Sequence, residues 1–224
     1  MIGVYDYTVL FTYLSLVSSV IGIFFTIQGN SVYGVLCIML SGFFDAFDGK
    51  IASLKRNRTD LAKKFGIQID SLADLVAFGV LPSCVGFCLL KQSVFFQEFC
   101  NESIVGHVIF YGSVVILIFY LLAALIRLAY YNVTEEERQK QETGSRSYFV
   151  GLPVTSSSVV FPMVFMISKI FSLELAIVYF ITMIIVGFAF ILKFSVKKPQ
   201  WKGLLIIALL GMVEFFFFLF YCVF

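Results

Sequence analysis

Charged residues are scarce in this chain. Only 13% of its 224 residues are Asp, Glu, Lys or Arg, whereas 60% are hydrophobic, and the mean hydropathy is +0.98. A soluble domain of this length would carry about a quarter charged residues. The composition therefore excludes an ordinary soluble globular domain and predicts a protein that is largely embedded in a membrane.

Three features that would indicate other functions are also missing: a histidine near the acidic residues, a metal-ligand pattern of cysteines and a cleavable signal peptide. The single histidine, His107, lies far along the chain from the acidic residues discussed below, so we do not expect it to be catalytic. The five cysteines lie mostly within apolar stretches without a metal-ligand pattern, which indicates packing residues rather than disulfides or metal ligands. The first segment carries Asp6 instead of a basic region and has no small-residue cleavage site, so we expect no cleavable signal peptide.

What the chain does contain is a series of apolar runs, each long enough to cross the hydrocarbon core of a membrane. Seven such runs lie near residues 4–28, 32–54, 67–90, 104–131, 150–171, 173–194 and 203–224. No linker, repeat or low-complexity tract separates them. We therefore expect an all-α integral membrane protein with a single domain over residues 1–224, whose core spans about 4–200 and whose last run adds a seventh helix.

Basic residues alternate between the connections of these runs. The basic connections are 54–66, 134–149 and 193–202. The opposite connections hold little positive charge beyond Lys91. Because Lys and Arg are enriched in cytoplasmic loops, the N-terminus and the basic connections are predicted to lie in the cytoplasm, and the C-terminus outside.

Four aspartates interrupt the second and third apolar runs. They are Asp45 and Asp48, three residues apart, and Asp70 and Asp74, four residues apart. On helices, these spacings place each pair on one face, about one turn apart. Ionisable groups at membrane depth are unfavourable by several kcal/mol unless they face a polar cavity, pair or bind cations. Four converging carboxylates would repel one another, and a divalent metal is the usual remedy, so the sequence predicts the functional site here.

The aspartates belong to a longer motif. The chain has DAFDGKIAS over residues 45–53 and GIQIDSLAD over residues 66–74. This pattern resembles the motif of the CDP-alcohol phosphatidyltransferase family, DxxDGxxAR followed by GxxxDxxxD. Seven of its eight fixed positions match, namely Asp45, Asp48, Gly49, Ala52, Gly66, Asp70 and Asp74. The eighth position is normally Arg and is Ser53 here, and the gap to Gly66 is longer than usual for the family.

The resemblance implies a six-helix membrane bundle that moves a phosphatidyl group from a CDP-linked lipid to an alcohol and releases CMP. Two divalent ions, Mg²⁺ or Mn²⁺, would assist the in-line attack on phosphorus, and hard carboxylate ligands favour these ions over Zn²⁺. Asp45, Asp48 and Asp70 would hold the ions, and Asp74 would be both a metal-side residue and the general base. The CDP-lipid would bind along Asp48, Gly49, Lys50, Ala52, Ser53, Lys55 and Gly66.

Three further segments resemble the phosphatidylserine synthase branch of that family. They are LADLVAFGVLP at 72–82, RLAYYNV at 127–133 and FVGLP at 149–153. The resemblance implies CDP-diacylglycerol and L-serine as substrates, a membrane-lipid environment, a homodimer and no nucleic-acid partner. Because a planar guanidinium binds a carboxylate through two hydrogen bonds, Arg127 would hold the serine carboxylate, with Asn132 and Arg146 closing the site.

Alternatives remain open from the residues alone. Another acceptor, such as glycerol phosphate or inositol phosphate, would use the same chemistry. A divalent-cation transporter would use the aspartates as an ion site, although transporters usually show paired halves with interrupted helices. Arg127 and Arg146 could instead be ordinary cytoplasmic-side anchors. Glu214, midway along the last apolar run, has no obvious partner in the sequence.

Overall fold

The computed structural model describes residues 3, 7–54, 59–94, 96–97, 104–141, 148–197 and 201–223, and these residues are overwhelmingly helical. The helices are η1 (Tyr7–Val9), α1 (Leu10–Ile27), α2 (Ser31–Leu54), α3 (Asp60–Asp74), η2 (Leu75–Val80), α4 (Leu81–Gln92), α6 (Ile104–Gln141), η3 (Val154–Ser156), α7 (Ser157–Ile170), α8 (Leu175–Ile191) and α9 (Trp201–Val223). Two short strands, β1 (Tyr148–Val150) and β2 (Ser195–Lys197), pair antiparallel.

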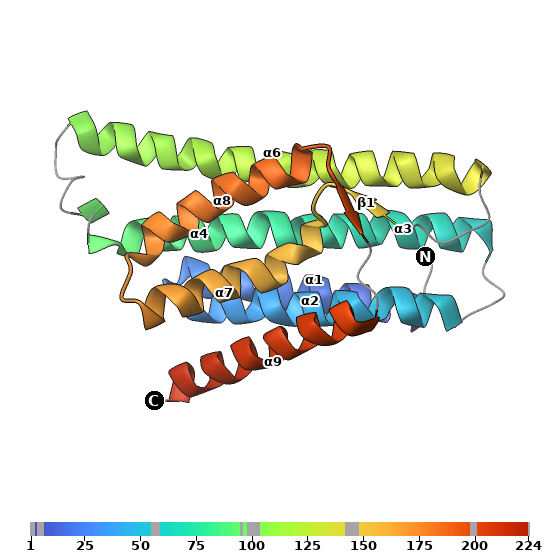
Figure 1. The fold of residues 1–224 in the computed structure, drawn as a ribbon, viewed down its shortest axis with the longest axis horizontal. Helices are drawn as coiled ribbons and strands as arrows, with labels where there is room; N and C mark the ends of the chain where they lie inside the picture. The colour runs from blue at the N-terminus through green and yellow to red at the C-terminus, as the bar shows by residue number, and fades with distance from the viewer. Residues whose placement is uncertain are drawn as a thin grey trace.

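The long helices lie side by side along one axis of the molecule (Figure 1). The helix α1 packs along α2, and α3, η2 and α4 follow one another as one rod beside them. The helix α8 packs against α6 and α7, while α9 lies on the outer side of α7 and α2. The turn between α1 and α2 and the end of α4 therefore lie at one end of the bundle, and the end of α2 and the start of α3 lie at the other (Figure 1).

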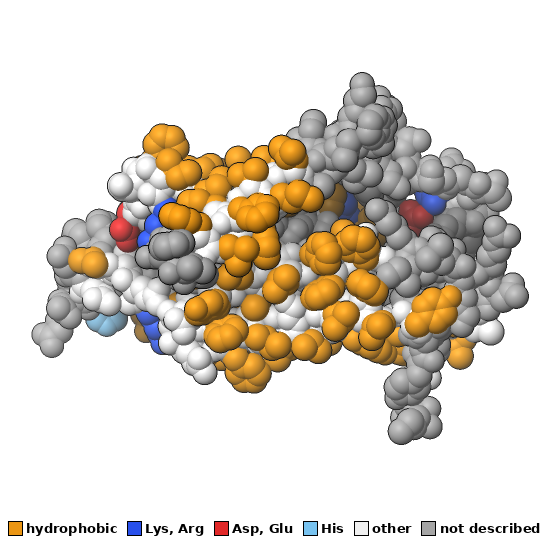
Figure 2. All heavy atoms as spheres, turned by 90° about the horizontal axis from the view of Figure 1, so that it is seen from below, with side chains coloured by type: hydrophobic (Ala, Val, Ile, Leu, Met, Phe, Trp, Pro, Cys, Tyr) orange, Lys and Arg blue, Asp and Glu red, His pale blue; other side chains and the backbone are white. Residues whose placement is uncertain are grey.

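The helices agree with a membrane-spanning protein. Four helical segments are long and apolar enough to cross a membrane, Leu10–Ile27, Ser31–Asp48, Asp60–Gln92 and Ile104–Arg138, and three shorter apolar helices accompany them. Figure 2 shows hydrophobic side chains over the middle of one face, with the visible charged side chains toward its two ends. A bilayer would cover this apolar surface. The protein is thus an all-α integral membrane protein, as the sequence predicted.

Two helices are longer than the sequence predicted. The region 60–66 was expected to be a loop, but α3 begins at Asp60 because the Thr59 hydroxyl accepts a hydrogen bond from the Ala62 amide (3.2 Å) and caps the helix. The helix α6 continues to Gln141, beyond the expected end at 131. At 1.5 Å per residue, its 38 residues span roughly 57 Å, well beyond a hydrocarbon core of about 30 Å. A salt bridge between Arg138 and Glu135 (2.6 Å) supports its polar last turns.

Small polar residues line the contact between α1 and α2. The Ser19 and Ser41 hydroxyls lie 2.9 Å apart, Ser41 also donates to the Ser15 carbonyl (3.1 Å), and Ser18 donates to the Cys37 carbonyl (3.3 Å). Small residues allow two helix backbones to approach closely, and in a membrane such packing and interhelical hydrogen bonds replace the hydrophobic driving force. The first two helices are therefore held in a fixed register, and α2 carries two of the four aspartates.

A π-helical turn, η2, follows Asp74 directly and joins α3 to α4. Pro82 has no N–H to offer the Phe78 carbonyl four residues earlier, and the buried Tyr120 hydroxyl of α6 donates to that carbonyl instead (2.7 Å). The Tyr120 hydroxyl also lies 2.8 Å from that of Ser157 in α7. Because π-helical turns change the rotational phase of a helix, η2 separates the face carrying the aspartates from the face that α4 buries in the core.

The two strands were not predicted. They pair Phe149 with Val196 and connect the segment before α7 to the segment after α8. Gly151 follows β1 with a φ of 72°, and a side chain there would lie 3.2 Å from the Leu192 carbonyl oxygen. Its amide donates to the Phe194 carbonyl (2.7 Å). The glycine is therefore required both by its left-handed backbone and by the close approach of the α8 end.

The helix α9 packs through aromatic side chains, with the rings of Phe218 and Phe165 5.5 Å apart. Glu214, one turn earlier, is only 1% exposed, and neither of its carboxylate oxygens has a hydrogen-bond partner in the described part of the chain. The structure thus supplies no partner for this acid among the described residues.

Candidate active site

The two aspartate pairs come from two antiparallel helices. Asp45 and Asp48 lie in the second half of α2, and Asp70 and Asp74 lie in the last two turns of α3. One carboxylate oxygen from each of Asp45, Asp70 and Asp74 lies within 4.8 Å of the other two. Asp74 is only 8% exposed. The hairpin of α2 and α3 therefore brings carboxylates from both halves of the motif to one point.

The fourth aspartate, Asp48, lies beside this group. It is not one of the three residues whose oxygens lie within 4.8 Å of one another. The buried Thr12 hydroxyl of α1 donates to Asp48 Oδ2 (3.2 Å). Sequence reasoning missed Thr12. The available signal was the line of small polar residues along α1, in which Thr12 precedes Ser15 and Ser19 at helical spacing.

The carboxylates are suited to a divalent cation. Oxygen ligands bind Mg²⁺ or Ca²⁺ at about 2.0–2.6 Å, so two ligands of one ion lie at most about 4–5 Å apart, which the 4.8 Å grouping satisfies. Asp70 Oδ1 is buried without a hydrogen-bond partner. No described Lys or Arg forms an ion pair with these acids. A buried acceptor without a partner beside other carboxylates is the arrangement that a bound cation would satisfy.

The residues predicted to bind the CDP-lipid follow the aspartates along α2. Gly49, Lys50, Ala52 and Ser53 lie in its last turns, where the structure describes the backbone but not the side chains. Lys55 lies outside the described residues. Gly66 lies on α3, one turn before Asp70. These backbone positions place the end of α2 beside the aspartate group.

Arg127 of α6 is 5% exposed and lies inside the bundle. Its Nε donates to the Leu152 carbonyl (3.0 Å), and its guanidinium lies 5.5 Å from the centre of the Tyr131 ring. Leu152 directly follows Gly151, so the 127–133 and 149–153 segments meet through this hydrogen bond. The buried position differs from that of a basic anchor exposed at the membrane surface.

Asn132 lies on the same helix, closer to the aspartates. Its Nδ2 donates to the Ser71 hydroxyl (2.8 Å), and Ser71 directly follows Asp70 on α3. This contact joins α6 to the helix carrying two aspartates, and sequence reasoning did not identify Ser71. Arg146, the third residue predicted to bind serine, lies outside the described residues.

Comparison with known proteins identifies the family. The sequence model of the CDP-alcohol phosphatidyltransferase family matches residues 8–195, which include all four aspartates and every helix from α1 to α8. The match covers far more than half of the chain. This chain belongs to the CDP-alcohol phosphatidyltransferase family.

Curated relatives have more specific names. The chain is 37% identical over 150 residues to the CDP-diacylglycerol–serine O-phosphatidyltransferase of Saccharomyces cerevisiae, covering 65% of this chain and 47% of that protein. It is 29% identical over 150 residues to the enzyme of the same name from Helicobacter pylori, covering 67% and 53%. It is 28% identical over 150 residues to the archaetidylserine synthase of Methanothermobacter thermautotrophicus, again covering 67% and 53%. The matches thus span about half the length of these relatives.

Proposed function

We propose that this protein is a phosphatidylserine synthase, which transfers the phosphatidyl group of CDP-diacylglycerol to the hydroxyl of L-serine and releases CMP. The observation that carries this proposal is the grouping of Asp45, Asp70 and Asp74 oxygens within 4.8 Å, from both halves of the family motif. The names of the yeast and bacterial relatives support serine as the acceptor.

Asp45, Asp48, Asp70 and Asp74 are proposed to hold two divalent ions, Mg²⁺ or Mn²⁺. When bound, such ions neutralise charge on the pyrophosphate and on the departing phosphate. Thr12 holds the Asp48 carboxylate in place through its hydrogen bond (3.2 Å). Gly49, Ala52 and Gly66 are proposed to let the cytidine diphosphate lie against the helices. Lys50 and Lys55 are proposed to supply positive charge near Ser53, where the family has Arg.

Asp74 is proposed to be the general base. A serine hydroxyl is a weak nucleophile near neutral pH, so a positioned carboxylate should remove its proton as attack begins. The serine oxygen then forms a bond to the lipid-side phosphorus. The bond between that phosphorus and the bridging oxygen breaks, and CMP leaves with the electron pair. The burial of Asp74 supports this role, because a shielded carboxylate is held in one geometry.

Arg127, Asn132 and Arg146 are proposed to bind serine. The Arg127–Leu152 hydrogen bond and the Tyr131 contact fix the plane of the guanidinium, as two-point recognition of a carboxylate requires. Asn132 donates a hydrogen bond to Ser71, which directly follows Asp70. This bond joins the helix of the proposed serine-binding residues to the helix that carries Asp70 and Asp74.

The proposed topology places the aspartate end of the bundle at the cytoplasmic surface, because α2 ends and α3 begins at that end and the sequence that connects them is basic. We further propose that residues 1–224 act as one catalytic domain and that the protein works as a homodimer, both on the family resemblance.

The test is CMP release from CDP-diacylglycerol by the purified chain, with L-serine, glycerol phosphate, inositol phosphate or no acceptor. Serine-dependent release of CMP together with phosphatidylserine is expected. Release only with glycerol phosphate or inositol phosphate would assign a different acceptor. Divalent-ion flux into proteoliposomes without any CMP release would instead support the transporter alternative.

A further inference from the structure

A polar cavity lies at the end of the bundle opposite the aspartates. It has a volume of about 730 Å³ and is formed by the α1–α2 turn, the end of α4, the end of α7 and the start of α8. Ser31 lines it, and Asp45 lies 14 residues further along α2, so the cavity is roughly 20 Å from the carboxylates. The 24 residues of α2 span about 36 Å, enough to cross a hydrocarbon core of about 30 Å, so the cavity at the start of α2 lies near the membrane surface opposite its end.

Two helix N-termini meet at this cavity. Ser31, Val32 and Tyr33 begin α2, and Leu175 and Ala176 begin α8, and all five line the cavity. The first internal hydrogen bonds of these helices come from Gly34 and Val178, so the preceding amides have no acceptor within their own helix. Such amides can donate hydrogen bonds to an anionic ligand in the cavity.

An independent observation also indicates a ligand. Ser168 lines the cavity and is 1% exposed, yet its hydroxyl has no hydrogen-bond partner in the described part of the chain. A hydroxyl in a helix can usually bond to a carbonyl of its own preceding turn, as Ser113 does in α6. A buried hydroxyl without a partner is rare in folded proteins, and an oxygen atom of a ligand in the cavity would satisfy it.

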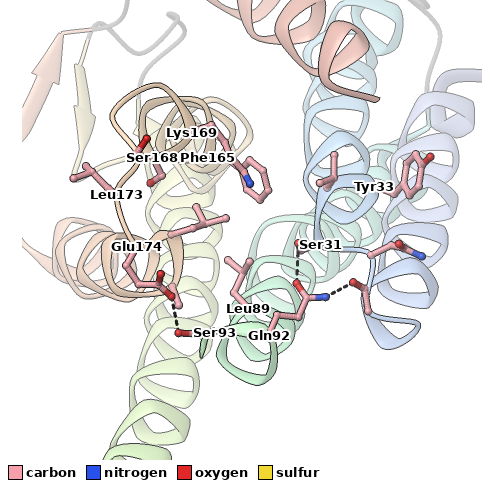
Figure 3. A pocket seen from close by; sticks show the side chains of 16 residues that line it. Ser31, Tyr33, Leu89, Gln92, Ser93, Phe165, Ser168, Lys169, Leu173 and Glu174 are labelled. Carbon is pink, nitrogen blue, oxygen red and sulfur yellow. Dashed lines mark hydrogen bonds between the residues drawn. The ribbon is translucent and has the colours of Figure 1, made fainter. Parts of the chain in front are cut away.

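The cavity also carries one charge of each sign. In Figure 3, Lys169 and Phe165 of α7 lie on one side and Ser31 and Tyr33 on the other, with Gln92 of α4 next to Ser31. Glu174 lines the cavity at the start of α8, where Ser93 donates to its carboxylate (2.6 Å). An anionic group would fit the helix N-termini and Lys169, and an ammonium group would fit Glu174. The ligand chemistry is therefore zwitterionic.

A second, mostly apolar cavity of about 450 Å³ adjoins the first, and the two share Gly29 and Gln92. It runs between α1, α4 and α6 and is lined by residues such as Ile27, Phe87 and Leu121. The Gln92 side chain donates to the Gly29 carbonyl and so connects the α1–α2 turn to α4 where the two cavities meet. A polar cavity beside an apolar one, at a membrane surface, matches a molecule with a polar head and a hydrocarbon chain.

We propose that these two cavities bind a zwitterionic phospholipid, with its phosphate at the α2 and α8 N-termini, Lys169 and Ser168. Its primary ammonium lies against Glu174, and one acyl chain occupies the apolar cavity. This site is separate from the proposed CDP-lipid site and lies at the opposite membrane surface.

The test is equilibrium binding to the full chain in detergent, measured by native mass spectrometry without turnover. The probes are dihexanoyl phosphatidylethanolamine, dihexanoyl phosphatidylglycerol, which lacks the amine, and glycerophosphoethanolamine, which lacks the chains. We expect Lys169→Gln to weaken binding of both lipids at least fivefold and Ser168→Ala to weaken it about fivefold, the effect of one hydrogen bond. Glu174→Gln should weaken binding of the ethanolamine lipid only. Lys193→Gln removes a charge just beyond the other end of α8 and should leave the binding of both lipids unchanged.

Glycerophosphoethanolamine has the same head group without acyl chains, so it distinguishes a lipid ligand from a soluble phosphoethanolamine compound. Binding at least tenfold weaker than that of the ethanolamine lipid supports a lipid, whereas equal binding would overturn the lipid assignment. A photoreactive ethanolamine lipid on the unmodified chain provides a test that does not depend on variants folding. Cross-links within 80–92 or 165–176 support the site. Cross-links only elsewhere, or equal affinities across the variants, would overturn it.

Discussion

Asp45 and Asp74 place carboxylate oxygens within 4.8 Å of each other although they belong to different helices and to different halves of the motif. The helices α2 and α3 run antiparallel and both pack against α1. The Thr12 hydroxyl of α1 donates to the neighbouring Asp48. Carboxylates this close repel one another in the absence of a cation or a shared proton.

Asp74→Asn should reduce serine-dependent CMP release by at least about 100-fold, because the amide has nearly the same shape but cannot accept the serine proton. Binding of CDP-diacylglycerol should be retained, and so should the melting temperature. Asp60→Asn is the matched control, since Asp60 lies on the same helix with its side chain 95% exposed. Asp45→Asn should differ by weakening metal-dependent CDP-lipid binding as well. Near-normal turnover of Asp74→Asn would remove the general-base assignment.

Removal of divalent ions with a chelator should abolish CMP release, and Mg²⁺ or Mn²⁺ should restore it. Thr12→Val should raise the Mg²⁺ concentration needed for half-maximal rate by about 10–100-fold, because residues that orient metal ligands have effects of that size. Thr12→Ser keeps the hydroxyl that donates to Asp48 and should stay near the wild-type value. An unchanged Mg²⁺ requirement in Thr12→Val would show that this hydrogen bond does not support a metal ligand.

Arg127→Ala should raise the apparent KM for serine by about tenfold or more without weakening CDP-lipid binding, because the two substrates contact different residues. Arg127→Lys keeps the charge but loses the two-point geometry, so it should also raise the KM. Thermal unfolding in detergent separates the serine contact from the Arg127–Leu152 hydrogen bond. A lower melting temperature with an unchanged serine KM would assign Arg127 a structural role only.

Gly22→Ala should destabilise the bundle, since a β-carbon at this position would lie 2.6 Å from the Cys37 Cβ across the α1–α2 contact. Overpacking of this kind is unfavourable by about 1–3 kcal/mol, and the melting temperature in detergent should fall. Gly112→Ala on α6 is the control, because nothing lies within 4 Å of the β-carbon that it would add. Its higher helix propensity should leave stability equal or greater. Equal loss in both variants would contradict the packing explanation.

The sequence by itself determined the membrane class, the approximate position of each helix and the choice of the aspartates as the candidate site. These properties depend on local composition and on spacing along a single helix, where positions three or four residues apart share a face whatever the rest of the chain does. The start of α3 also depends on a local feature, the Thr59 cap. It was not predicted because the polar residues within 60–66 precede an apolar run, and this stretch was therefore interpreted as a loop. The length of α6 was missed for a similar reason, because its last turns are polar and contribute no apolar periodicity.

The tertiary structure decided which distant residues meet. The Thr12–Asp48 hydrogen bond, the Asn132–Ser71 hydrogen bond and the pairing of β1 with β2 all join segments far apart in the chain. Such contacts depend on helix crossing angles and rotational phase, and the π-helical turn after Asp74 changes that phase in a way that hydrophobic periodicity does not reveal. The polar cavity around Ser168 likewise exists only because the ends of α4 and α7 and the starts of α2 and α8 pack at one end of the bundle.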